Sequence, residues 1–352
     1  MTLPPLKLVL TAVGCPGAST LIRMLKANGE RDLHIHGVDM RPDAVGRFLC
    51  DGFSLVPAGA SPGYIPALAE VVERERPDLL FVQSSHEIET VARHRGVFET
   101  LGARVLADGV DGIVTAGDKA LMHKACAEIP VPQPELLQPR SLDEFLAGAR
   151  ELGYPEVPVC FKPPVAKGSR GFRILSAEVD RVHELLHERP INRYMTLPEF
   201  EGLFRGVEPF PALMLMEYVD APEITVDLFA DQGEMVFHQT RTREEFLTGL
   251  AMAFKTIDRP DLVELTGKVV RHLGLDYYQS VQWIGGKLLE INPRVSTFVY
   301  QEDFIIPYLG IKYALGELTK DDVAGVQTRL RTSRRSVRYY DQVFWDVAEQ
   351  PA

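Results

Sequence analysis

The stretch QSVQWIGGKLLEINPRVS, residues 279–296, carries side chains that could bind a phosphate and a metal ion together. Alternate residues of a strand face the same side, so Glu290 and Asn292 project from one face. Both supply the hard oxygen ligands that Mg²⁺ prefers. Arg294 continues the alternation if the strand persists past Pro293, and its guanidinium could bind phosphate oxygens.

Gln282, on the partner strand, joins that site in only one of two turn geometries. A two-residue turn at 285–286 would pair Val281 with Glu290 and place Gln282 on the opposite face. A three-residue turn or bulge that includes Lys287 would pair Gln282 directly with Glu290. The plainer alternative is an exposed hairpin edge that carries polar side chains.

Three further stretches could bind a nucleotide. Lys162 ends the strand-like VPVCFKPP, and the glycines of KGSRG, residues 167–171, free backbone N–H groups for phosphate oxygens. In LMEYVDAPEITVD, Tyr218 and Val219 could present backbone groups to a flat base, and Glu223 could accept from ribose hydroxyls. The alternatives are a surface lysine, a flexible turn and a hairpin with polar edges.

Cations also gather in and after QTRTREEFLTGLAMAF, residues 239–254. Arg241, Arg243 and Lys255 could hold an anionic substrate or a transferred phosphate. A solvated charge pattern is an equally good interpretation of this stretch.

The N-terminal stretch LTAVGCPGAST, residues 10–20, has the outline of a dinucleotide-binding turn, and a following strand-like stretch ends at Asp39. Gly14 and Gly17 are three residues apart, however, which does not match G-x-G-x-x-G. An NAD-dependent oxidoreductase therefore stays an alternative that these glycines do not favour. We expect the turn and its helix N-terminus to face a carboxylate or phosphate of a substrate, with Asp39 as a strand-end acid.

A second strand-like stretch ends at QSSHEIET, at the carboxyl edge where α/β sheets bind ligands. Ser84, Ser85 and Glu87 are candidate substrate contacts there. Helix capping is the plainer role for these three side chains.

The elements that must position these residues change in character along the chain. Strand and helix patterns alternate over residues 6–107, which predicts a doubly wound, mostly parallel sheet. AGDKALMHKACAE then reads as a helix capped by Asp118 and stopped by the prolines of IPVPQP. Strands, a helix at about 261–273 and a hairpin at 277–294 follow, and residues 321–352 read as a tail. Its basic stretch at 329–338 is better explained as a solvated edge or a packing arm than as a nucleic-acid-binding segment.

Composition limits the function classes. The 352 residues exceed one ordinary core, and a net charge of −11 argues against a nucleic-acid binder. No apolar run reaches the roughly 20 residues of a membrane helix, and no secretory signal is evident. The widely spaced Cys15, Cys50, Cys126 and Cys160 fit reduced thiols better than a disulfide frame or a zinc site, so we expect a cytoplasmic protein.

Taken in order, these pieces resemble the ATP-grasp superfamily, and within it the branch that is similar to carbamoyl-phosphate synthetase. The resemblance covers roughly residues 6–315. Its motifs are AGDKALMHKACAEIPVPQP, CFKPPVAKGSRG, MEYVDAPEITVD and SVQW followed by LLEINPRVS.

The resemblance implies a fold, a set of site residues and cofactors. The fold would be α/β and α+β: a Rossmann-like domain at 1–107, an ATP-grasp domain at 108–320 and a tail at 321–352. ATP would lie between a small subdomain, about 125–220, and residues 221–320. The expected ATP contacts are Lys119, Lys162, Gly168, Ser169, Gly171, Glu217, Tyr218, Val219 and Glu223. Gln282, Glu290 and Asn292 would hold one or two Mg²⁺ ions, for which Mn²⁺ could substitute, and Arg294 would steady the transferred phosphoryl group, with Arg241, Arg243 and Lys255 as further catalytic candidates.

The implied activity is ligation of a carboxylate, activated as an acyl phosphate, to an amine, with release of ADP and phosphate. The substrates would be small molecules, and the resemblance leaves room for a homodimer. Gln282 stands where many relatives have aspartate, and Val295-Ser296-Thr297 replaces a serine-arginine run, which puts bicarbonate chemistry in doubt. A single module also argues against a complete carbamoyl-phosphate synthetase. A nucleotide-binding or regulatory protein without turnover is the main alternative.

Overall fold

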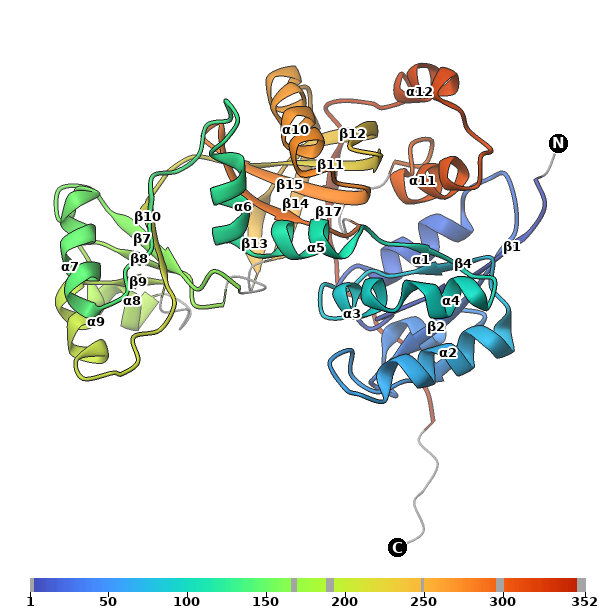
Figure 1. Cartoon of the computed structure of the whole chain (residues 1–352), viewed down its shortest axis with the longest axis horizontal. Helices are drawn as coiled ribbons and strands as arrows, with labels where there is room; N and C mark the ends of the chain where they lie inside the picture. The colour runs from blue at the N-terminus through green and yellow to red at the C-terminus, as the bar shows by residue number, and fades with distance from the viewer. Residues whose placement is uncertain (1–2, 166–169, 188–192, 248–249, 296–300, 347–352) are drawn as a thin grey trace, which may run out of the picture.

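The computed structural model describes residues 3–165, 170–187, 193–247, 250–295 and 301–346. Its strands form three sheets, which Figure 1 shows laid out along the long axis of the molecule. Within these residues, no helix has the length and apolar character needed to cross a membrane.

The first sheet is parallel throughout, with strand order β3-β2-β1-β4-β5, as the alternating pattern predicts. Its strands are β1 (Leu6–Leu10), β2 (Leu33–Asp39), β3 (Gly52–Leu55), β4 (Leu79–Phe81) and β5 (Arg104–Leu106). Its helices are α1 (Ala18–Lys26), η1 (Val45–Phe48), α2 (Tyr64–Glu75), α3 (Ile88–Arg93) and α4 (Arg95–Thr100). His94 separates α3 from α4. Apolar side chains bury both faces of the sheet, which fits strands that read as near-continuous hydrophobic runs.

Two short helices lead from this sheet to the rest of the chain. These are α5 (Val110–Gly117), which the sequence did not indicate, and α6 (Lys119–Cys126). Asp118 caps α6 as expected, since its Oδ1 accepts from the backbone N–H groups of Ala120 at 2.8 Å and Leu121 at 3.1 Å.

The second sheet, shown in green in Figure 1, has strand order β6-β10-β7-β8-β9. Its strands are β6 (Leu136–Leu137), β7 (Val159–Lys162), β8 (Arg173–Leu175), β9 (Tyr194–Met195) and β10 (Met214–Glu217), and its helices are α7 (Leu142–Glu151), α8 (Arg181–His187) and α9 (Leu197–Phe204). Phe145 of α7 stacks on Phe200 of α9 at 3.8 Å between ring centroids. Phe161 of β7 meets both rings edge-on, which fixes the strand that ends at Lys162.

The third sheet has strand order β13-β14-β12-β11-β15-β16, with β17 paired to β14. Its strands are β11 (Glu223–Asp231), β12 (Glu234–Thr242), β13 (Glu244–Leu247), β14 (Leu250–Ile257), β15 (Tyr277–Ile284), β16 (Lys287–Asn292) and β17 (Arg335–Val337). The helices around it are α10 (Pro260–Leu273), α11 (Ile306–Ala314) and α12 (Lys320–Gln327).

The faces of the third sheet differ in character. Val226, Val281 and Trp283 belong to a buried apolar cluster that also includes Val269 and Val270 of α10. Side chains alternate along strands, so the intervening polar residues face the other way. That opposite face carries the predicted site.

The segment after 320, expected as a tail, contains α12 and β17. The basic stretch is held by two ion pairs, Arg331 with Asp303 at 3.0 Å and Arg335 with Glu244 at 2.9 Å. β17 pairs with β14 at the end of the third sheet, and all three of its residues are exposed, which agrees with the predicted solvated edge.

Ion pairs join the chain just before β2 to α11 and the segment that follows it. The side chain of Arg31, fully buried, pairs with Glu317 and donates to Tyr308. Lys312 of α11 pairs with Glu30 at 2.6 Å. These contacts hold the end of the N-terminal sheet against the third sheet.

Candidate functional site

The β15–β16 hairpin resolves the position of Gln282. The turn has two residues, Gly285 and Gly286, both with positive φ, as a tight hairpin turn requires. The register then shifts between Gln282 and Trp283, which leaves Leu289 as an extra residue in β16. This bulge pairs Gln282 directly with Glu290, the geometry that puts both on one face.

Glu290 lies among cations on that face. Its Oε2 is 3.5 Å from Nζ of Lys119, and its Oε1 accepts from Nδ2 of Asn292 at 3.2 Å. Burial alone would raise the pKa of Glu290, but Lys119, Lys162 and Arg243 outweigh it and lower the pKa to about 2. Glu290 is therefore ionised at neutral pH and suited to a divalent cation.

Lys162, at the end of β7, brings the second sheet to this cluster. Its side chain is buried, and burial lowers its pKa. Glu290 counteracts that effect, while Lys119 adds to it. A ligand with several negative charges would satisfy these two lysines better than one carboxylate does.

His123 of α6 lies beside this cluster and was not among the residues predicted from the sequence. It is buried, and its Nδ1 is 2.6 Å from Oε1 of Gln133. Burial lowers the pKa of His123 despite that hydrogen bond, and Lys162 lowers it further. Its position four residues after Lys119, on the same helix face, is the signal that could have identified it.

Arg241 and Arg243 lie on the same side of the sheet but in different surroundings. Arg241 is buried, and its Nε and Nη2 bind the two carboxylate oxygens of Asp227 at 2.6 and 3.3 Å. Ser280 also donates to Asp227 at 2.7 Å. Nη1 of Arg243 instead bonds to Glu223 at 2.7 Å and to Gln282 at 2.6 Å, within the predicted site.

Lys255 points away from these residues. Its neighbour Thr256 pairs with Arg241, so alternation along β14 places Lys255 on the opposite face. The structure therefore brings two of the three predicted cations of this region to the polar face.

The predicted base-binding residues follow β10 and pack on the hairpin turn. Glu217 pairs with Lys287 and accepts from the backbone N–H of Glu135 at 3.0 Å. A Cβ on Gly285 would lie 2.9 Å from Cγ1 of Val219, so only glycine allows this approach. Tyr218 is half-buried against the cluster that includes Cys160 and Met216, and burial raises its pKa.

The predicted phosphate-covering loop falls partly outside the described residues, since Gly168 and Ser169 are not among them. Gly171 is described and has φ +75°. A Cβ there would lie 2.6 Å from Cδ of Pro163, so the loop returns close to the end of β7.

Arg294, just past β16, reaches the N-terminal sheet. Its Nε donates to Oγ of Ser85 at 2.8 Å, beyond the end of β4. Cys15, in the turn between β1 and α1, is close by: burial raises the pKa of its thiol to about 11, although the charge of Arg294 opposes this. The structure thus places Ser85, a predicted substrate contact, beside Arg294, a predicted phosphate-binding residue.

The glycine turn is closed by Asp39. Oδ2 of Asp39 accepts from the backbone N–H of Gly14 at 2.7 Å, and Oδ1 accepts from that of Arg41 at 2.9 Å. Gly17 precedes α1 with φ 95°. Gln83, which the sequence did not single out, holds the same turn by donating to the carbonyls of Thr11 and Ala12. Asp39 thus stabilises the turn, and its carboxylate is turned inward.

Ser84 and Glu87 have different roles at the start of α3. Oγ of Ser84 accepts from the N–H of His86 at 3.2 Å, a local turn contact before α3, whose N-cap residue Glu87 makes no side-chain capping bond. Glu87 is buried, which raises its pKa to about 7; Asp39 adds to the rise, and the hydroxyls of Thr11 and Tyr64 oppose it.

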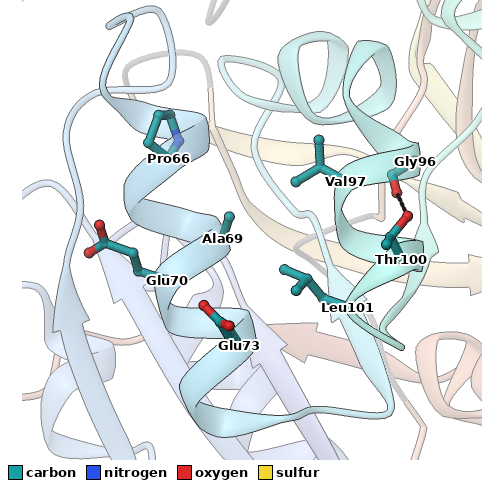
Figure 2. A pocket seen from close by; sticks show the side chains of 8 residues that line it. All are labelled: Pro66, Ala69, Glu70, Glu73, Gly96, Val97, Thr100 and Leu101. Atoms are coloured by element: carbon teal, nitrogen blue, oxygen red, sulfur yellow. Dashed lines mark hydrogen bonds between the residues drawn. The ribbon is translucent and has the colours of Figure 1, made fainter.

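A surface hollow of about 560 Å³ lies elsewhere, between α2 and α4 (Figure 2). Ala69 and Leu101 face each other across it, with Glu70 and Glu73 on the α2 side. None of the predicted site residues lines it. Among the residues that the structure describes, there is no group of three or more His, Cys, Asp or Glu side chains that could hold a metal ion.

Comparison with known proteins gives matches in sequence and in fold. Residues 209–336 match the family described as ATP-grasp in the biosynthetic pathway with Ter operon. The large chain of carbamoyl phosphate synthase from Sulfurisphaera tokodaii is 24% identical over 276 residues, which cover 71% of this chain and 24% of the relative. That from Pyrobaculum aerophilum is 27% identical over 279 residues, covering 74% and 26%. The chain thus spans about a quarter of the length of these relatives.

Solved structures share the fold at low identity. A biotin carboxylase from Campylobacter jejuni, in a β-γ-ATP complex, has a TM-score of 0.64 at 17% identity and covers 90% of this chain and 73% of its own. The biotin carboxylase domain dimer of Hydrogenobacter thermophilus 2-oxoglutarate carboxylase, with MgADP, ADP and bicarbonate, has a TM-score of 0.65 at 17% identity, covering 90% and 72%. N5-carboxyaminoimidazole synthetase from Staphylococcus aureus, with ADP, has a TM-score of 0.57 at 10% identity, covering 83% and 70%.

The parallel five-stranded sheet followed by two largely antiparallel sheets matches the ATP-grasp fold of these biotin carboxylases. The sequence matches point to the same group of proteins. The chain belongs to the ATP-grasp superfamily, as a distant relative of the large chain of carbamoyl phosphate synthase and of biotin carboxylase domains.

Proposed function

We propose that this chain is an ADP-forming ligase that activates a carboxylate as an acyl phosphate and joins it to an amine. ATP-grasp proteins generally activate carboxylates with ATP. The observation that carries the finer proposal is the grouping of Lys119 and Lys162 around Glu290, on one face of the third sheet. There, the two lysines could bind a polyphosphate, and the ionised carboxylate beside them could bind a divalent cation.

The residues fit MgATP by their chemistry. Glu290 is a carboxylate with a pKa of about 2, and Asn292 supplies an amide next to it, so both offer oxygen ligands to Mg²⁺. Lys119, Lys162 and the backbone near Gly171 would contact the phosphates. The base would lie along 217–219.

The ion would neutralise charge on the phosphate oxygens. The reaction then proceeds in two displacements. A carboxylate oxygen attacks the γ-phosphorus, the bond to the bridging oxygen breaks, and ADP leaves. The amine nitrogen next attacks the acyl carbon, the carbon–oxygen bond to phosphate breaks, and phosphate leaves as the nitrogen loses a proton.

The protein's own part is charge placement and positioning. Lys162 and Lys119 balance the charge of the polyphosphate. Arg294 is well placed to hold oxygens of the moving phosphoryl group, because its guanidinium lies between the end of β16 and Ser85. The substrate carboxylate would therefore lie against the carboxyl edge of the parallel sheet.

An activity screen should pair many carboxylates with many amines and record ADP release. With an active pair, ¹⁸O placed in the carboxylate should appear in the released phosphate. Label that stays entirely in the product would exclude the acyl phosphate. ATP binding without ADP release across the screen would instead favour a nucleotide-binding protein without turnover.

One variant sharpens this test. Glu290→Ala should abolish ADP release, and normal turnover there would contradict the metal assignment.

A homodimer stays a prediction, to which the domain dimer from Hydrogenobacter thermophilus lends support. Light scattering of the purified chain would decide it.

A further inference from the structure

The segment after β17 exposes large aromatic side chains. We call residues 339–345 the aromatic strap. Tyr340 and Phe344 are 79% and 87% exposed, and Tyr339 is exposed as well. Apolar groups that gather on a surface in this way are typical of a protein–protein contact, in which Tyr, Phe, Trp and Arg are enriched. The strap therefore has the composition of an interaction site.

Two residues of the aromatic strap attach it to the fold. Asp341 pairs with Arg23 of α1 at 3.2 Å. Trp345 packs on Phe48 of η1, with 4.9 Å between the ring centroids. These contacts hold the strap in place, while the rings that directly precede the two contact residues stay uncovered.

The hollow between α2 and α4 offers a matching surface (Figure 2). Pro66, Ala69 and Leu101 supply apolar groups to it, and Glu70 and Glu73 lie on its α2 side. Among the residues that the structure describes, no Lys or Arg side chain lines the hollow, and neither carboxylate has an ion-pair partner. An apolar surface with uncompensated negative charge suits aromatic rings that arrive together with cations.

The chain supplies cations directly before the aromatic strap. Residues 329–338 contain five arginines and no Asp or Glu, whereas the whole chain has a net charge of −11. Complementary charge on two surfaces steers their encounter and fixes their register. The strap with its preceding arginines and the α2–α4 hollow thus complement each other in polarity and in charge.

The aromatic strap and the hollow of one chain lie on opposite faces of the first sheet. The strap contacts α1 and η1, and α1 packs in a cluster with Leu8 and Leu10 of β1. α2 and α4 pack in a separate cluster with Val9, which faces the other way. A strap attached to one face therefore meets such a hollow on a second copy of the chain.

We propose that the aromatic strap of one copy docks in the α2–α4 hollow of a second copy, and that the exchange is reciprocal. Tyr340 and Phe344 lie against the apolar part of the hollow, and the arginines of residues 329–338 lie near Glu70 and Glu73. A two-fold axis pairs both straps with both hollows and closes the assembly as a dimer. The inference does not depend on the proposed activity.

The oligomeric state of the purified chain tests the inference. Light scattering over a range of concentrations should show a dimer. The strap variant Tyr340→Ser/Phe344→Ser and the hollow variant Glu70→Lys/Glu73→Lys should each weaken dimerisation by about tenfold or more. A wild-type chain that is monomeric throughout, or a dimer that either variant leaves intact, would overturn the inference.

Mixing the two variants identifies the surfaces that meet. The strap variant keeps its hollow and the hollow variant keeps its strap, so a mixed pair retains one of the two contacts. We expect the mixture to associate more tightly than either variant alone, and no gain on mixing would overturn the exchange of straps. Leu185→Ser/Leu186→Ser, which changes exposed apolar side chains of α8, is the control and should dimerise as wild type does. Loss of the dimer in that control would assign the interface to α8 and overturn the inference.

Discussion

Arg294 donates from Nε to Oγ of Ser85 at 2.8 Å, and this contact joins two parts of the chain 209 residues apart. One partner follows the strand that carries Glu290, and the other follows a central strand of the parallel sheet. A group held by Arg294 would therefore lie within reach of both the polar face of the third sheet and the carboxyl edge of the first. Under the proposed function, the substrate carboxylate would lie there, next to the terminal phosphate of ATP.

Arg294→Lys should reduce kcat by about 10²–10³. An ammonium cannot reproduce the bidentate hydrogen bonds of a guanidinium to the phosphoryl oxygens, where negative charge develops in the transition state. The affinity for AMP-PNP should change little, since Lys119 and Lys162 remain. Steady-state rates with an active substrate pair, together with calorimetric binding, would measure both quantities. Ser85→Ala is the matched control, and it should reduce kcat much less. A kcat near wild type in Arg294→Lys would remove Arg294 from the reaction.

The β15–β16 hairpin shows which parts of the site could be predicted from the sequence. Alternation indicated the shared face of Glu290 and Asn292, and the two glycines indicated the turn. The position of Gln282 stayed open because it depends on one extra residue, Leu289, in β16. A bulge is set by the packing of both strands and leaves no reliable mark on the sequence of one.

The arginines show where sequence reasoning ends. Arg241 and Arg243 are two residues apart and have the same charge, so local pattern cannot distinguish them. Their partners lie on other strands: Asp227 for Arg241, and Glu223 with Gln282 for Arg243. Only the pairing of β12 with β11 reveals which arginine is buried in an ion pair and which faces the predicted site.

Arg241→Met should destabilise the fold by about 3–5 kcal/mol, because it leaves the buried carboxylate of Asp227 without its cation. Urea unfolding would measure the loss. Arg93→Met, which removes an exposed partner of Glu89, is the control and should change the midpoint little.

The pairing of Arg241 with Asp227 can be tested separately from their burial. In Arg241→Met/Asp227→Leu, both charges are absent, and most of the lost stability should return. A double variant that loses the sum of the two single losses would show that the side chains act independently. That result would reopen a role for Arg241 in binding the substrate.

Gly171→Ala should weaken nucleotide binding several-fold and destabilise the chain by about 1–3 kcal/mol. Its φ of +75° strains a residue with a side chain, and the new Cβ would lie 2.6 Å from Cδ of Pro163. Gly202→Ala in α9 is the control: a Cβ there meets nothing within 4 Å, so stability should rise by about 1 kcal/mol. Calorimetry with AMP-PNP and urea unfolding measure the two effects. Unchanged binding in Gly171→Ala would separate this glycine from the phosphate loop.

Glu87 gives the fold a predictable dependence on pH. Burial raises the pKa of its carboxyl from 4.5 to about 7, with Asp39 adding to the rise. The folded state thus keeps a proton that the unfolded chain releases, and the contribution of Glu87 to stability is complete below about pH 4.5. It is lost as the pH rises to about 7, by about 3 kcal/mol in total.

Glu87→Gln should therefore flatten this part of the stability profile. The variant carries an uncharged amide at every pH, so its stability relative to wild type should improve as the pH rises from 4.5 to 7 and then stay constant. Urea midpoints at half-unit intervals of pH would show the trend, and Glu89→Gln, which changes an exposed carboxyl nearby, should follow wild type. A Glu87→Gln profile parallel to wild type would mean that Glu87 is ionised in the fold. The carboxylate would then need a cation, and the guanidinium of Arg294, which like Glu87 acts on the thiol of Cys15, would be the first to examine.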